Sequence, residues 1–120
     1  MSAMSVTIYH NPKCSKSCQT LELLGEQGIT PDIVEYLKSP PTAEQLHGIL
    51  AQLGFVPRDL MRKKEEIYAE CELDNPSLTD VELVNFMIKH PILIERPIIL
   101  ANGKAAIGRP PEKVLEILST

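Results

Sequence analysis

Apolar and polar positions follow a strand-like pattern at the start of the chain and a helix-like pattern soon after it. Residues 6–9 alternate and are rich in β-forming side chains, so they predict a strand. Leu21 and Leu24 then share one helix face, and Gly28 is a natural helix end. Residues 32–36 predict a second short strand. A strand, a helix and a strand within about 30 residues favour a right-handed parallel crossover.

The middle of the chain predicts helices that begin at polar residues. Thr42 and Gln45 have the spacing of a capping box, and an apolar stripe follows them as far as a glycine. Thr79 and Glu82 repeat this spacing before a second helix, which ends at a proline. Between the two helices we expect a short helix at 57–62 and then irregular, partly helical chain.

The last third of the chain predicts a hairpin and a closing helix. Asn102 and Gly103 stand between two β-forming runs, which is the strongest short signal for a hairpin. The stretch "RPPEKVLEIL" predicts a last helix with proline in its first turn. The order β-α-β, then helices, then β-β-α is typical of an α/β, thioredoxin-like fold with a mixed four-stranded sheet.

Composition and charge narrow the class of protein. The 120 residues are enough for one domain, and 43% apolar with 23% charged residues is typical of a globular chain. The net charge of −4, without a basic block, argues against a nucleic-acid surface and an anionic membrane surface. No apolar run is long enough for a membrane span, and the first residues lack a secretory signal pattern. With only three cysteines, we expect a cytoplasmic protein with reduced thiols.

Two cysteines stand where the first strand passes into the first helix, in "YHNPKCSKSCQTLELL". The turn before them places Cys14 at or just before the first helical turn, where backbone N–H groups are unpaired and the helix dipole is positive. Lys13 and Lys16 add positive charge. These features favour the thiolate form of Cys14 and would hold an oxyanion beside it. A nucleophilic thiolate next to an anion site is the resulting hypothesis.

The second thiol leaves alternatives open. Cys18 lies one helical turn after Cys14, so it is either a resolving thiol that captures the oxidised Cys14 or a small buried side chain three residues before Leu21. Cys71 is distant in sequence and is interpreted as a bystander. A zinc site that includes His10 would need two tight ligand pairs, and the chain offers one loose pair, so we expect no metal.

Four separated blocks resemble the glutaredoxin-coupled arsenate reductase family, and together they span nearly the whole chain. They are "TIYHNPKCSKSCQTLELL", "LMRKK", "FMIKHPILIERPIIL" and "IGRPPEKVLEIL". The resemblance implies a thioredoxin-like fold that carries a helical insertion. We therefore expect residues 1–120 to form a single thioredoxin-like domain with the insertion at about 42–92.

The resemblance also implies site residues. It makes Cys14 the nucleophile and places before it a histidine, His10, that influences the thiol. The bond between Arg96 and Pro97 is expected to be cis. Three arginines are implied to bind the anion: Arg62, Arg96 and Arg109.

The chemistry implied by the resemblance is arsenate reduction without a bound cofactor or metal. Cys14 attacks arsenate, glutathione attacks the thiol–arsenic adduct, and glutaredoxin reduces the mixed disulfide. The chain departs from the family at Cys18, where an arginine is usual. An alternative comes from the same superfamily, whose redox regulators bind RNA polymerase. A Cys14–Cys18 switch would then control contact with a protein partner, although those regulators have two residues between their cysteines and this chain has three.

Overall fold

The computed structural model describes residues 6–118, which fall into two compact units. One unit contains residues 6–39 and 96–118, and the other contains residues 40–95. The second unit includes the region predicted as a helical insertion, and the prediction that both belong to one domain stays a prediction.

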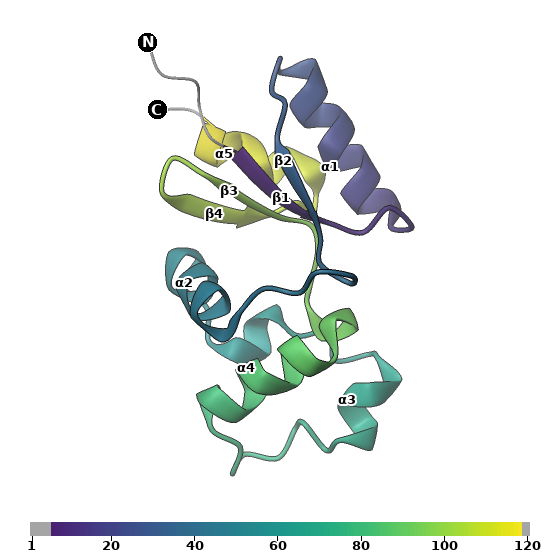
Figure 1. The fold of residues 1–120 in the computed structure, drawn as a ribbon, viewed down its shortest axis with the longest axis vertical. Helices are drawn as coiled ribbons and strands as arrows, with labels where there is room; N and C mark the ends of the chain where they lie inside the picture. Colours follow the sequence, from purple (N-terminus) through teal and green to yellow (C-terminus); the bar gives the residue numbers. More distant parts are fainter. Residues whose placement is uncertain (1–5, 119–120) are drawn as a thin grey trace. The chain divides into compact units, whose positions relative to one another are not determined.

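A four-stranded sheet forms the centre of the first unit (Figure 1). Strand β1 runs parallel to β2 and antiparallel to β3, and β4 completes the order β2-β1-β3-β4. The alternating apolar residues of the sequence therefore form the predicted mixed sheet and parallel crossover. The strands are β1 (Val6–His10), β2 (Asp32–Glu35), β3 (Ile98–Ala101) and β4 (Lys104–Ile107).

Helical segments pack against one face of this sheet. They are α1 (Ser15–Glu26), the 3-10 helix η3 (Pro111–Val114) and α5 (Leu115–Leu118). Their buried side chains join those of β1 and β3 in one core, and each buried valine, leucine or isoleucine of this core stabilises the fold by about 1.5–3 kcal/mol. This core holds α1 against β1 and so fixes the turn between them. Its members are Val6, Ile8, Leu24, Ile99, Ala101, Val114 and Ile117.

Turn chemistry sets the C-terminal part of the unit. Asn102 and Gly103 have φ values of 55° and 70°, as a tight two-residue hairpin requires. The predicted hairpin is therefore confirmed. The predicted last helix begins with proline in its first turn, as expected, and is divided into the 3-10 helix η3 and the short helix α5.

The second unit is helical. Thr42 and Thr79 are the N-caps of its two longest helices, and both capping boxes form as predicted. The helix predicted at 57–62 is a shorter 3-10 helix. Helix α4 packs against α2, η1 and η2. The elements are α2 (Ala43–Leu53), η1 (Pro57–Leu60), α3 (Glu66–Glu70), α4 (Asp80–Lys89) and η2 (Pro91–Leu93). Within residues 6–118, no helix has the length and apolar character needed to cross a membrane.

Candidate active site

Cys14 occupies the turn between β1 and α1. Its N–H group donates to the carbonyl of Asn11 at 3.0 Å, and the Asn11 side chain accepts from the N–H of Lys13 at 3.0 Å. Cys14 is the N-cap of α1, with an extended backbone at φ −99° and ψ 123°. The predicted position of this cysteine at the first turn of the helix is therefore confirmed.

The start of α1 is open to an anion. In the part of the chain that the structure describes, no side chain caps this helix, and its first turn contains no acidic residue. Lys13 and Lys16 are exposed on either side of Cys14. Unpaired N–H groups and the positive end of the helix dipole favour negative charge here. The geometry therefore suits a thiolate or an oxyanion, and the thiolate state of Cys14 stays a prediction.

Arg109 brings a positive charge to the sulfur of Cys14. Its Nη2 atom lies 3.6 Å from Cys14 Sγ, and its Nε–H donates to the carbonyl of Arg96 at 2.7 Å. The bond to Arg96 anchors one side of the planar guanidinium, so the other side points at the sulfur. A guanidinium stays charged at all relevant pH values and offers five donors to an oxyanion.

Gly108 allows Arg109 to reach this position. The N–H group of Gly108 donates to the carbonyl of Pro97 at 3.0 Å. A Cβ atom at Gly108 would lie 2.5 Å from Thr20 Oγ1 and 2.8 Å from Pro97 Cγ. The chain before Arg109 therefore packs directly on α1 and on Pro97, and only glycine fits there without a shift. Gly108 could not be predicted as a site residue from the sequence, because its neighbours in space are distant in sequence.

The other two predicted arginines lie in different surroundings. Arg96 is partly buried and belongs to the same unit as Cys14, and its peptide bond to Pro97 is cis. Arg62 belongs to the second unit. Two carboxylates bind it, Glu65 at 3.0 Å from its Nε and Glu95 at 3.2 Å from its Nη1. The structure therefore brings Arg96 and Arg109 together, and the approach of Arg62 to the thiol stays a prediction.

His10 lies at the end of β1 and binds a buried serine. Its Nδ1 atom is 2.6 Å from Ser17 Oγ, which also accepts from the N–H of Asn11 at 3.1 Å. His10 is 7% exposed and Ser17 is fully buried. Burial lowers the pKa of His10, and the negative charge of Glu35 opposes this by raising it. The net effect favours a neutral imidazole.

Ser17 is a site residue that was not predicted from the sequence. It lies three residues after Cys14 on the buried face of α1, where a leucine or alanine would be usual. A polar residue on a core-facing position was the available signal, because a buried hydroxyl needs a partner. That partner, His10, comes from the strand before the turn, so the Ser17–His10 pair ties together the two ends of the segment that carries Cys14.

The remaining thiols occupy separate places. Cys18 is exposed, and its Sγ donates to the carbonyl of Pro12 at 3.3 Å, so the interpretation of Cys18 as a small buried side chain is wrong. Cys71 is half-buried and follows α3 in the second unit. All three cysteines are free thiols. Between residues 6 and 118, no group of three or more His, Cys, Asp and Glu side chains is arranged to hold a metal ion.

Comparison with known proteins shows the family of this chain. The sequence model of the ArsC family matches residues 9–117. The chain belongs to the ArsC family. It is 50% identical over 116 residues to the arsenate reductase of Haemophilus influenzae, covering 96% of this chain and 100% of that protein. It is 53% identical over 114 residues to YfgD, an uncharacterised protein of Escherichia coli, covering 94% of this chain and 96% of that protein.

A solved structure shares the fold over the same length. The arsenate reductase from Vibrio cholerae superposes with a TM-score of 0.94 at 54% sequence identity, covering 97% of this chain and 99% of that one. The thioredoxin-like fold predicted for this ArsC protein is therefore confirmed.

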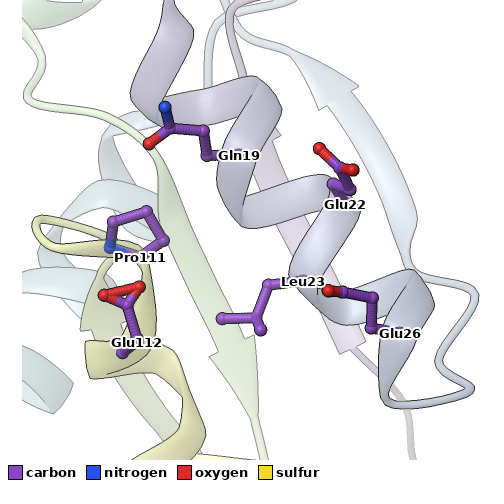
Figure 2. Close-up of a pocket in the computed structure, with 6 residues that line it drawn as sticks. All are labelled: Gln19, Glu22, Leu23, Glu26, Pro111 and Glu112. Carbon is purple, nitrogen blue, oxygen red and sulfur yellow. The ribbon is translucent and has the colours of Figure 1, made fainter.

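A separate hollow in this ArsC protein lies between α1 and η3, with a volume of about 370 Å³ (Figure 2). Three carboxylates contribute to its lining, and Cys14 does not. Carboxylates repel an oxyanion, whereas the start of α1 attracts one. The hollow is therefore not the place where an oxyanion would meet the thiol. Its lining residues are Gln19, Glu22, Leu23, Glu26, Pro111 and Glu112.

Proposed function

We propose that this ArsC protein is an enzyme that reduces arsenate to arsenite through Cys14. The thiol attacks arsenic(V), a Cys14 sulfur–arsenic bond forms, and one arsenate oxygen leaves as water after it takes up the thiol proton. The observation that carries the proposal is the guanidinium of Arg109 at 3.6 Å from Cys14 Sγ, at the uncapped start of a helix. Identities of about half to relatives named arsenate reductase support the same chemistry.

The residues around the sulfur have separable roles. Arg109 and the first N–H groups of α1 stabilise the oxyanion and the charge that develops in the transition state. Arg96 anchors Arg109 through its carbonyl group, and we propose that its side chain and that of Arg62 complete the anion site. His10 remains neutral beside Ser17 and is proposed to influence the thiol through the shared turn.

The electrons for turnover come from outside the protein in this proposal. Glutathione attacks the arsenic adduct on Cys14, and glutaredoxin then reduces the resulting glutathione mixed disulfide. The site needs neither a metal nor a bound organic cofactor for these steps. A pathway that consumes free thiols requires a reducing compartment, so the proposed location is the cytoplasm.

Arsenite release tests the proposed function. Purified wild-type protein and the Cys14→Ser variant would be compared with arsenate, glutathione and glutaredoxin, and arsenite would be measured by chromatography with elemental detection. Wild type is expected to turn over many times, and Cys14→Ser is expected to release no arsenite above the reaction without protein. Cys71→Ser is the matched control, because it removes a thiol from the second unit. Full turnover by Cys14→Ser would exclude the mechanism.

A second candidate function is redox regulation through a protein partner. The exposed thiol of Cys18, one helical turn after Cys14, is the observation that favours it. A disulfide between the two would change the surface at the start of α1, and RNA polymerase is the partner that the superfamily suggests. Pull-down of polymerase by oxidised and reduced protein separates the two functions. Redox-dependent capture without arsenite release would favour the regulator.

A further inference from the structure

Cys18 lies at a distance from Cys14 that permits a disulfide. The N–H group of Cys18 donates to the carbonyl of Cys14 at 3.0 Å, which is the first complete turn of α1. One helical turn separates the two Cα atoms by about 6 Å, and disulfides accept Cα separations up to about 6.8 Å. Cys14 is the N-cap and has an extended backbone, so its side chain is not confined to the rotamers of a regular helix.

The Cys18 side chain is also directed toward the turn that carries Cys14. Helical side chains lean toward the N-terminus of their helix. Accordingly, Cys18 Sγ donates to the carbonyl of Pro12, two residues before Cys14, at 3.3 Å. A thiol is a weak donor, and this one is exposed, so rotating it away from that carbonyl costs little. A change of side-chain rotamers is then the main movement needed to join the two sulfurs.

We infer that Cys18 is a further catalytic residue, a resolving thiol for the arsenic adduct on Cys14. This inference rests on the proposed function, since it needs that adduct. Cys18 Sγ attacks Cys14 Sγ, the sulfur–sulfur bond forms, and the sulfur–arsenic bond breaks with its electron pair remaining on arsenic. Two thiols are oxidised to one disulfide, arsenic(V) is reduced to arsenic(III), and the Cys18 proton passes to an arsenite oxygen.

The surroundings of the two sulfurs suit both this step and the return to the reduced state. Cys14 is 8% exposed, so an external thiol has limited access to an adduct on its sulfur. Cys18 lies in the same helical turn, and its thiol reaches that adduct without diffusing in from solvent. In the disulfide, an external dithiol attacks the accessible Cys18 sulfur. Cys14 is then the leaving group, and the guanidinium of Arg109 stabilises its developing thiolate. The reductant for this route is a dithiol, whereas the glutathione route uses a monothiol.

A single-turnover experiment without added thiol tests the inference. Fully reduced protein, freed of reductant, would be mixed with arsenate, and arsenite and free thiols would be measured in the same sample. Wild type is expected to release about one arsenite per chain and to lose two thiols, with the peptides containing Cys14 and Cys18 joined in the mass spectrum. Cys18→Ser is expected to reduce this release at least about tenfold. Cys71→Ser is the matched control and is expected to behave as wild type.

The outcomes separate this inference from the proposed function. If wild type turns over with glutathione and glutaredoxin but releases no arsenite without added thiol, the role of Cys18 is overturned and the proposed function stands. The same conclusion follows if the oxidised wild-type protein joins Cys14 to Cys71, or two chains to each other. Absence of arsenite under every condition overturns the proposed function itself. Peptide mapping of wild type gives a result even if Cys18→Ser does not fold.

Discussion

The guanidinium of Arg109 lies 3.6 Å from the sulfur of Cys14, although 95 positions of the chain separate the two residues. The thiol comes from the turn after β1, and the positive charge comes from the chain just after β4. The central sheet and the packing of α1 bring these segments together. Charge at this position stabilises a thiolate both when it attacks and when it leaves, so the pair has a role in each half of the proposed cycle.

Replacing Arg109 is expected to lower the catalytic efficiency of arsenate reduction. Arg109→Ala should lower kcat/KM for arsenate about 100-fold, the usual loss when one oxyanion donor is removed. Arg109→Lys should retain only part of the wild-type kcat/KM. A lysine ammonium cannot bind the Arg96 carbonyl and lie beside the Cys14 sulfur at the same time, as the guanidinium does. Steady-state kinetics with glutathione and glutaredoxin measures both. Lys104→Ala, an exposed cation on β4, is the matched control. Activity of Arg109→Ala within twofold of wild type would contradict this role.

Gly108 is expected to tolerate no side chain. Gly108→Ala should destabilise the protein by about 1–3 kcal/mol, because the added methyl meets Thr20 at 2.5 Å and Pro97 at 2.8 Å. Combining it with Thr20→Ala removes the closer neighbour, so the two changes together should cost at least about 0.5 kcal/mol less than their sum. Urea denaturation measures all three variants. Gly25→Ala in α1, where an added methyl meets nothing within 4 Å, should stabilise by about 0.5–1 kcal/mol. If the free-energy changes of Gly108→Ala and Thr20→Ala simply add in the double variant, the close contact with Thr20 has no energetic effect.

Local chemistry made most of the fold predictable from the sequence. The capping boxes at Thr42 and Thr79 and the Asn102–Gly103 turn depend on residues that are close in sequence, and all three form as expected. The position of Cys14 was predictable for the same reason, since a turn followed by an apolar stripe defines a helix start. The elements that deviate are short, such as η1 and η3, which are 3-10 helices with proline in their first turn.

The remainder of the site depends on contacts between distant segments. Nothing near Gly108 in sequence indicates that Thr20 and Pro97 exclude a side chain there. Helix periodicity allowed Cys18 to be either buried or exposed, because its position lies at the edge of the apolar stripe, and only the packed helix shows that it is exposed. Arg62 matched a family motif, but its ion pairs with Glu65 and Glu95 could not be inferred from spacing alone.

The buried hydroxyl of Ser17 is expected to stabilise the turn that carries Cys14. Ser17→Ala leaves His10 Nδ1 and the Asn11 N–H without the partner they share, which should cost about 1–3 kcal/mol. Chemical denaturation measures the loss, and a double-mutant cycle with His10→Ala, which removes the ring nitrogen without adding another polar group, isolates the part that belongs to the His10–Ser17 bond. Ser15→Ala, at an exposed position of the same helical turn, is the matched control. A coupling energy near zero in the cycle would mean that this bond does not stabilise the fold.

Burial of His10 is expected to make stability depend on pH in a defined direction. Burial lowers its folded-state pKa below the usual value of about 6.5, with Glu35 opposing the shift. Above a pH of about 6.5, His10 is neutral in both the folded and the unfolded protein, and its contribution to the free energy of unfolding is fully present. As pH falls below about 6.5, the unfolded state binds a proton before the folded state does, so the free energy of unfolding decreases. His10→Asn should reduce this decrease between pH 7 and pH 5 in urea denaturation. His47→Asn, at an exposed position of α2, is the matched control. An unchanged slope in His10→Asn would show that His10 does not cause the acid sensitivity.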